Sequence, residues 1–88
     1  MPRARTFNAD AARFGAIVRG LRQAKGWTLR KLATRSGMNA TYVSIVERGA
    51  NVPSVSTALE LLEVLGADAG AVFAQLAAAR QRPKASSG

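Results

Sequence analysis

The stretch TLRKLATRSGMNATYVSIVERG, residues 28–49, decides how this chain folds. Its first half has the features of a short helix, because the Thr28 hydroxyl can cap a helix start and Leu32 follows one turn later. Gly37 then interrupts the pattern, and a glycine just past a helix can take a positive φ without a Cβ penalty. We therefore expect a helix over residues 29–36, followed by a sharp change of direction.

The second half of the stretch has the features of another helix, over about residues 40–48. Asn39 is a good N-cap, and Val43 and Val46 follow at a spacing that places both on one face. Gly49 then stops the helix. The stretch therefore predicts two short helices joined by a tight turn, with both valines facing inward.

This pattern resembles the helix-turn-helix of the Xre/Cro family of phage and bacterial repressors, over roughly residues 14–76. The resemblance is carried by Leu32-Ala33, Gly37, Ser44, Glu47-Arg48-Gly49, Pro53-Ser54 and Leu65-Gly66. It implies an all-α fold, a compact five-helix bundle with a lambda-repressor-like DNA-binding domain. The TYVSIVERG and GAVFAQL segments are similar to those of restriction–modification controller proteins. A small phage-type repressor and the antitoxin of a toxin–antitoxin pair are alternatives.

The composition favours a small domain with a polyanionic partner. The chain has 88 residues, 48% of them hydrophobic, which is enough for one compact core. Its formal net charge is +8, and all of the excess lies in residues 1–48, whereas residues 49–88 are balanced. The positive charge therefore sits on the half that carries the two-helix motif, as in a nucleic-acid-binding protein.

The residue types that are missing argue against several other classes. The chain has no cysteine and no histidine, so it lacks a disulfide framework, the commonest general base and the commonest metal ligand. It also has no glycine-rich phosphate loop. We expect no enzymatic activity, no metal and no cofactor. Charged residues and glycines interrupt the apolar region 58–79, so we expect no membrane span or signal peptide, and a cytoplasmic, nucleoid-associated location.

The helix before the motif is expected from Asn8, its cap, to about Lys25. Its apolar stripe is Phe14, Ile17, Val18 and Leu21, and Trp27 should cover the end of the core.

Two further helices are expected after the motif. Ser54 or Ser56 caps a fourth helix that ends at Leu65, and Asp68 caps a fifth helix over residues 69–80. The side chains expected in the core are Leu59, Leu62, Leu65 and Phe73. These helices are almost free of basic residues, so we assign them to dimerisation, with Val72 and Leu76 facing a second subunit. The alternative is a monomer in which all of these side chains are core.

The resulting division of the chain is a basic arm (1–7), the DNA-binding domain with its dimerisation helices (8–80) and a disordered polar tail (81–88). The arm is either a frayed terminus or a segment whose Arg3 and Arg5 touch DNA.

The resemblance implies that the helix over residues 40–48 lies in a major groove. The residues assigned to base contacts are Asn39, Ala40, Thr41, Ser44 and Ile45. Asn39 and Thr41 can hydrogen-bond base edges, and Ala40 or Ile45 can press on a thymine methyl group. Asn39 can equally be only a cap. The residues assigned to the DNA backbone are Thr28, Arg30, Lys31, Arg35, Tyr42, Arg48 and Asn51.

Two positions are judged against the resembled family. Arg22 stands where that family has an arginine that pairs with the glutamate of the ERG ending, here Glu47. Such a pair fixes orientation more than it adds stability. Leu29 stands where many members have glutamine, and leucine cannot hydrogen-bond DNA, so that contact is not carried over.

One reading helix discriminates too few base pairs to find a site in a genome, since each good contact is worth about 1–3 kcal/mol. We therefore expect a homodimer on an inverted-repeat operator in double-stranded DNA, with half-sites about 34 Å apart. RNA polymerase is a further candidate partner. From another class, a basic RNA-binding or membrane-surface module would need exposed aromatic side chains or a one-sided basic helix. The aromatic residues here are mostly assigned to the core.

Overall fold

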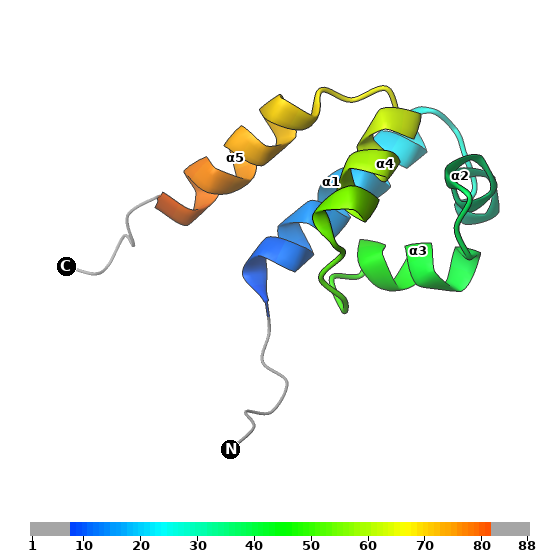
Figure 1. Cartoon of the computed structure of the whole chain (residues 1–88), viewed down its shortest axis with the longest axis horizontal. Coiled ribbons are helices and arrows are strands. Elements are labelled where there is room, and N and C mark those ends of the chain that lie inside the picture. Colours follow the sequence, from blue (N-terminus) through cyan, green and yellow to red (C-terminus); the bar gives the residue numbers. More distant parts are fainter. Residues whose placement is uncertain (1–7, 82–88) are drawn as a thin grey trace, which may run out of the picture.

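The computed structural model describes residues 8–81, which form five helices and no strand. The helices are α1 (Ala9–Ala24), α2 (Leu29–Ser36), α3 (Ala40–Glu47), α4 (Val55–Val64) and α5 (Ala69–Gln81). In Figure 1, α2 and α3 lie at one end of the molecule, α5 lies at the other, and α1 and α4 lie between them. The all-α helix-turn-helix fold expected from the sequence is confirmed. The proposed arm, 1–7, and most of the proposed tail lie outside the described residues.

Side-chain caps set where the helices begin. The Oδ1 atom of Asn8 accepts a hydrogen bond from the Ala11 amide at 2.9 Å, and the Thr28 hydroxyl accepts one from the Lys31 amide at 3.0 Å. At the start of α4 the cap is Ser54, which accepts from the Thr57 amide at 3.1 Å. Each cap satisfies an amide that has no partner within its helix.

The turn between α2 and α3 depends on Gly37. This residue has φ 67°, in the left-handed region, and the Met38 amide behind it donates to the Ala33 carbonyl at 2.8 Å. This arrangement closes α2 and lets α3 begin with only three residues between the two helices.

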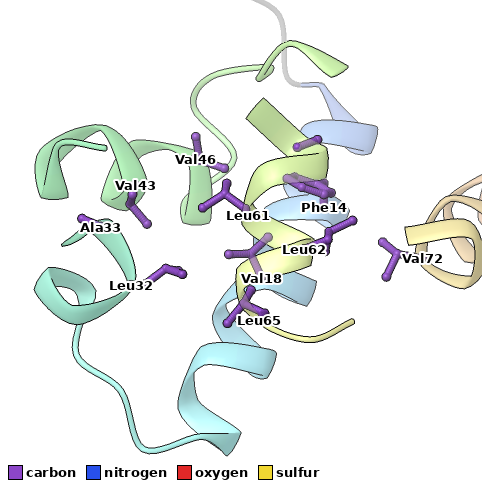
Figure 2. Close-up of a cluster of buried hydrophobic side chains, with 11 residues drawn as sticks. Phe14, Val18, Leu32, Ala33, Val43, Val46, Leu61, Leu62, Leu65 and Val72 are labelled. Carbon is purple, nitrogen blue, oxygen red and sulfur yellow. The ribbon is translucent and has the colours of Figure 1, made fainter. Parts of the chain in front are cut away.

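The core lies where α1, α2, α3 and α4 meet (Figure 2). Its fully buried side chains are Val18, Leu32, Val43, Val46, Leu61 and Leu62. Val43 and Val46 therefore face inward as predicted. The expectation that Leu59 is core is wrong, since Leu59 is 43% exposed and Leu61 is buried instead. Two apolar stripes that share Leu62 and Leu65 fit the helical period, one through Leu59 and one through Leu61, and the fold buries the second.

The assignment of α5 side chains from the sequence is wrong in two places. Val72 packs against the core and is only 7% exposed, so it does not present itself to a second subunit. Phe73, expected to complete the core, is 37% exposed. Leu76 is half-buried and packs partly against the core. The reason is geometric: neighbouring residues on a helix point about 100° apart, and the alanines around them do not mark which face is outside.

Helices α1 and α3 approach each other without side chains between them. A methyl group on Gly15 of α1 would overlap the Val46 carbonyl oxygen and lie 2.6 Å from the Glu47 carbonyl oxygen. One turn earlier on α1, the backbone of Ala12 lies against Gly49, and a methyl group on Gly49 would lie 2.7 Å from the Ala12 Cα atom. The position of α3 relative to α1 is therefore set by direct backbone contact.

Candidate nucleic-acid interface

The outer face of α3 takes little part in holding the molecule together. Its inner face is fixed by the buried side chains of Val43, Val46 and Glu47. On the opposite side, Thr41 is exposed and Ile45 is half-buried, but Ile45 does not belong to the side chains that pack against the core.

The other residues on and beside α3 that were assigned to DNA contacts, to bases or to the backbone, occupy different environments. Arg48, at the end of α3, is exposed, and Ser44 is half-buried. Ala40 and Tyr42 both pack against the core, so less of each is available to a partner. The surface that α3 offers thus centres on Thr41 and Ile45.

Asn39 serves as the N-cap of α3. Its Oδ1 atom accepts hydrogen bonds from the Thr41 amide at 2.7 Å and the Tyr42 amide at 3.3 Å. The carboxamide oxygen is therefore occupied, and only its NH₂ group remains for a base edge. A two-pronged contact to adenine, which uses both ends of an amide, would break the cap.

Arg22 and Glu47 form a bidentate ion pair that joins α1 to the end of α3. The Arg22 Nε atom donates to Glu47 Oε2 at 2.7 Å, and Nη2 donates to Oε1 at 2.9 Å. A third hydrogen bond runs from Arg22 Nη1 to the Trp27 carbonyl at 2.8 Å. Both side chains are largely buried. The hydrogen bonds to Glu47 raise the pKa of Arg22 further above its ordinary value, so this guanidinium stays charged at any working pH.

Three cations surround the Trp27 ring at the start of α2, and we call these four residues the Trp27 cluster. Lys25 Nζ lies 5.0 Å from the ring centroid, Lys31 Nζ lies 5.5 Å from it, and the Arg35 guanidinium carbon lies 5.0 Å from it. Such distances are typical of cation–π contacts. Within residues 8–81, none of the three cations has a carboxylate within ion-pair distance. The cluster is a concentrated positive charge held by one aromatic ring.

From the sequence, Trp27 was predicted only to pack, and Lys25 was not among the predicted contact residues. The available signal was the spacing of Lys31 and Arg35, four residues apart on one face of α2, with Trp27 four residues before Lys31. The remaining backbone candidates Arg30 and Asn51 are exposed, while the Thr28 hydroxyl is occupied as the α2 cap.

An apolar surface lies on the part of the molecule formed by α4 and α5. Val55 is 71% exposed, and Phe73 and Leu59 lie on the same two helices. Beside them is a groove of about 150 Å³, lined almost entirely by apolar atoms. The groove is lined by Asp10, Ala11, Phe14, Val52, Pro53, Val55, Ala58, Phe73 and Leu76. Asp10 also pairs with Arg80 at 3.6 Å, which links α1 to α5. In Figure 1, α5 lies at the opposite end of the molecule from α2.

The described residues show neither a metal site nor a membrane-spanning helix. In residues 8–81, no three carboxylate, cysteine or histidine side chains gather as a metal site would require. None of the five described helices combines the length and the apolar character needed to cross a bilayer.

Comparison with known proteins agrees with this geometry. Residues 13–76, which include α2, α3, α4 and most of α1, match the family described as "Helix-turn-helix domain". The chain belongs to this helix-turn-helix family.

Relatives of this helix-turn-helix protein include regulators and a controller protein. It is 37% identical over 65 residues to an uncharacterized HTH-type transcriptional regulator from Mycobacterium tuberculosis, and the match covers 74% of this chain and 25% of that protein. The chain therefore matches only about a quarter of that relative's length.

Two solved structures are similar over most of this helix-turn-helix protein. The restriction–modification controller protein C.AhdI from Aeromonas hydrophila is 38% identical with a TM-score of 0.70, and the match covers 75% of this chain and 100% of that one. The clp gene regulator ClgR from Corynebacterium glutamicum is 33% identical with a TM-score of 0.71, covering 80% of this chain and 91% of that one.

Proposed function

We propose that this protein is a sequence-specific, dimeric transcriptional regulator that binds an operator in double-stranded DNA. The observation that carries the proposal is the outer face of α3, which the fold positions firmly and yet leaves outside the core. Backbone contact at Gly15 and the Arg22–Glu47 pair fix α3 from behind. A helix held in this way can enter a major groove without reorganising.

The contacts divide by role. Thr41 and Ile45, with Ser44 beside them, read base edges, and the Asn39 NH₂ group can add one hydrogen bond. Exposed cations at Arg30, Arg48 and in the Trp27 cluster face phosphates, and Tyr42 and Asn51 add neutral contacts. The three cations of the cluster lack acidic partners in the described part of the chain, so the phosphates of a DNA backbone would supply the missing counter-charge.

The dimer forms through the apolar surface of α4 and α5. Val55, Leu59 and Phe73 are exposed apolar side chains, and Leu76 lines the adjoining groove. This assignment keeps Leu76 from the sequence analysis and replaces Val72, which is core. A two-fold pair joined there would present two copies of α3 to an inverted repeat.

The biological setting is proposed on the likeness to C.AhdI, whose name describes a restriction–modification controller. We propose that this chain controls such a system by occupying its operator in the nucleoid, in contact with or in place of RNA polymerase. A phage-type repressor or an antitoxin would use the same surfaces. A neighbouring methyltransferase and endonuclease gene pair would favour the controller, and a neighbouring toxin gene the antitoxin.

Selection of bound duplexes from a random pool tests the proposal. We expect an inverted repeat whose half-sites are one helical turn apart. The Thr41→Ala variant, which leaves the Asn39 cap of α3 in place, should relax sequence preference. In contrast, Arg30→Ala or Lys31→Ala should weaken all sequences alike and lower the salt dependence of binding. No enrichment of any sequence, or identical effects of the two sets of variants, would contradict the proposal.

A further inference from the structure

The chemistry of the reading face is unusual in what it offers to a base pair. The side chains on the outer side of α3 are a hydroxyl at Thr41, a hydroxyl at Ser44 and an aliphatic chain at Ile45. The only amide nearby, Asn39, has its oxygen occupied by two backbone amides. No side chain between Ala40 and Glu47 is an arginine, lysine, asparagine or glutamine, the types that grip guanine or adenine with two hydrogen bonds.

Ile45 is the large apolar side chain on this face that does not belong to the hydrophobic core. Ala40 and Tyr42, also on α3, pack against the core. Ile45 is half-buried but does not pack against the core. On the major-groove edges of the bases, the C5 methyl group of thymine is the one bulky apolar group among hydrogen-bond donors and acceptors. An aliphatic side chain in the groove is stabilised by contact with that methyl group. Against any other part of a base edge it removes water from a donor or acceptor and offers no hydrogen bond in return.

We propose that Ile45 is a specificity-determining residue that reads the C5 methyl group of a pyrimidine in each half-site. The ligand is thymine, and by the same chemistry also 5-methylcytosine, whose methyl occupies the same place in the groove. This inference rests on the proposed operator binding. It has a regulatory consequence for any half-site that has cytosine at that position: C5 methylation of this cytosine strengthens binding, so the protein distinguishes modified from unmodified DNA there.

A thymine-to-deoxyuridine scan of the selected operator tests the inference with the unaltered protein. Deoxyuridine lacks only the C5 methyl group, so base pairing is kept. Burial of one such group corresponds to about a fourfold change in affinity. We expect one position per half-site where the substitution raises Kd about fourfold, and about fifteenfold when both half-sites are changed. Other thymines should show little effect. A scan in which no position responds would overturn the inference.

A double-mutant cycle then identifies the side chain. Ile45→Ala should bind the thymine duplex more weakly than the unaltered protein does, but it should bind the deoxyuridine duplex as well as the unaltered protein does. The ratio of the Kd for deoxyuridine to the Kd for thymine should therefore fall from about four to about one. Thr41→Ala is the matched control on the same face, and it should lower affinity while keeping the ratio. If Ile45→Ala keeps the ratio, the methyl is read by another residue and the assignment is wrong. Thermal unfolding of both variants checks that neither has lost its fold.

The third measurement concerns cytosine. When the responsive T·A pair is replaced by C·G, binding should weaken. With 5-methylcytosine in place of that cytosine, the affinity should rise again by about fourfold. Equal affinity for the methylated and unmethylated duplexes would overturn the regulatory consequence. These results are separable from failure of the proposed function, because a protein that enriches no sequence at all yields no operator to scan. An operator that is enriched but indifferent to every methyl group contradicts only this inference.

Discussion

Gly15 is the residue at which α1 and α3 touch through their backbones. A methyl group there would collide with the carbonyl oxygens of Val46 and Glu47, which are held in the last turn of α3 and cannot move aside. Gly20, on the same helix, has no atom within 4 Å of the place its methyl would take. The two glycines therefore form a matched pair in one helix.

We predict opposite effects of alanine at these two positions. Gly15→Ala should destabilise the protein by about 1–3 kcal/mol, as expected when a packed contact is overfilled. Gly20→Ala should stabilise it by roughly 0.5–1 kcal/mol, because alanine is the better helix former and nothing obstructs it. Urea denaturation followed by circular dichroism measures both. Equal effects would mean that the α1–α3 contact is looser than described.

Ser36 has a buried hydroxyl without a hydrogen-bond partner among residues 8–81. It is the last residue of α2, is 8% exposed and lies beside the core. A buried hydroxyl left unpaired costs about 1–3 kcal/mol, so Ser36→Ala should leave the free energy of unfolding unchanged or raise it by roughly 1 kcal/mol. Denaturant unfolding again gives the value. A loss above 1 kcal/mol would show that the hydroxyl has a partner in solution.

At the scale of elements, the Arg22–Glu47 pair is the polar link between α1 and α3. Glu47→Ala leaves a buried guanidinium without its carboxylate, and we predict a loss of about 3 kcal/mol. The double variant Arg22→Met/Glu47→Leu replaces both charges by apolar groups and should recover most of that loss. Thermal unfolding of the wild type, Glu47→Ala and the double variant gives the comparison. A double variant as unstable as Glu47→Ala would show that the pair stabilises the fold by itself.

The two-helix motif was predictable because local signals there agree with one another. Thr28 and Asn39 cap α2 and α3, Gly37 takes the positive φ that the turn needs, and the two inward valines have no competitor on their helix. Each of these features is decided within a few residues, so the sequence alone suffices. The Arg22–Glu47 pair, in contrast, followed only from family resemblance, since nothing local links residues 25 positions apart.

The orientations of α4 and α5 were not fully predictable. On α4, Leu59 and Leu61 are both apolar but point in different directions, and only the neighbouring helices decide that Leu61 is buried and Leu59 exposed. On α5 the same holds for the adjacent residues Val72, which is buried, and Phe73, which is exposed. The Trp27 cluster was missed for a related reason. A tryptophan beside a core usually serves to fill that core. Only the structure shows that Lys25, which lies between α1 and α2, places a third cation at the Trp27 ring.

The molecule as a whole separates its two surfaces. Helices α2 and α3 lie at one end of the molecule and α5 at the other, with α4 between them (Figure 1). The Trp27 cluster lies at the start of α2, and the exposed apolar side chains of Val55, Leu59 and Phe73 lie on α4 and α5. Because these surfaces do not overlap, the proposed dimer and the proposed DNA complex can form together. A change on one surface should therefore leave the other intact.

We predict that Val55→Asp disrupts the dimer and leaves the fold unchanged. Val55 is 71% exposed, so a carboxylate there costs the monomer little, whereas burying it against a second subunit is unfavourable. The dimer dissociation constant should rise roughly 30-fold or more. Ser56→Asp, on the next exposed residue of α4, is the control for added charge. Sedimentation equilibrium measures the association of both, and a Val55→Asp variant that stays dimeric would place the interface elsewhere.

The independence of Thr41 and Ile45 from the core has an evolutionary consequence. Substitutions at these positions do not disturb the packing that keeps the chain folded, so descendants can change operator preference without passing through unstable intermediates. The helices behind them act as an inherited frame, and the outer side chains are the variable part. Lineages carrying this frame should therefore diverge in the sites they recognise faster than in their architecture.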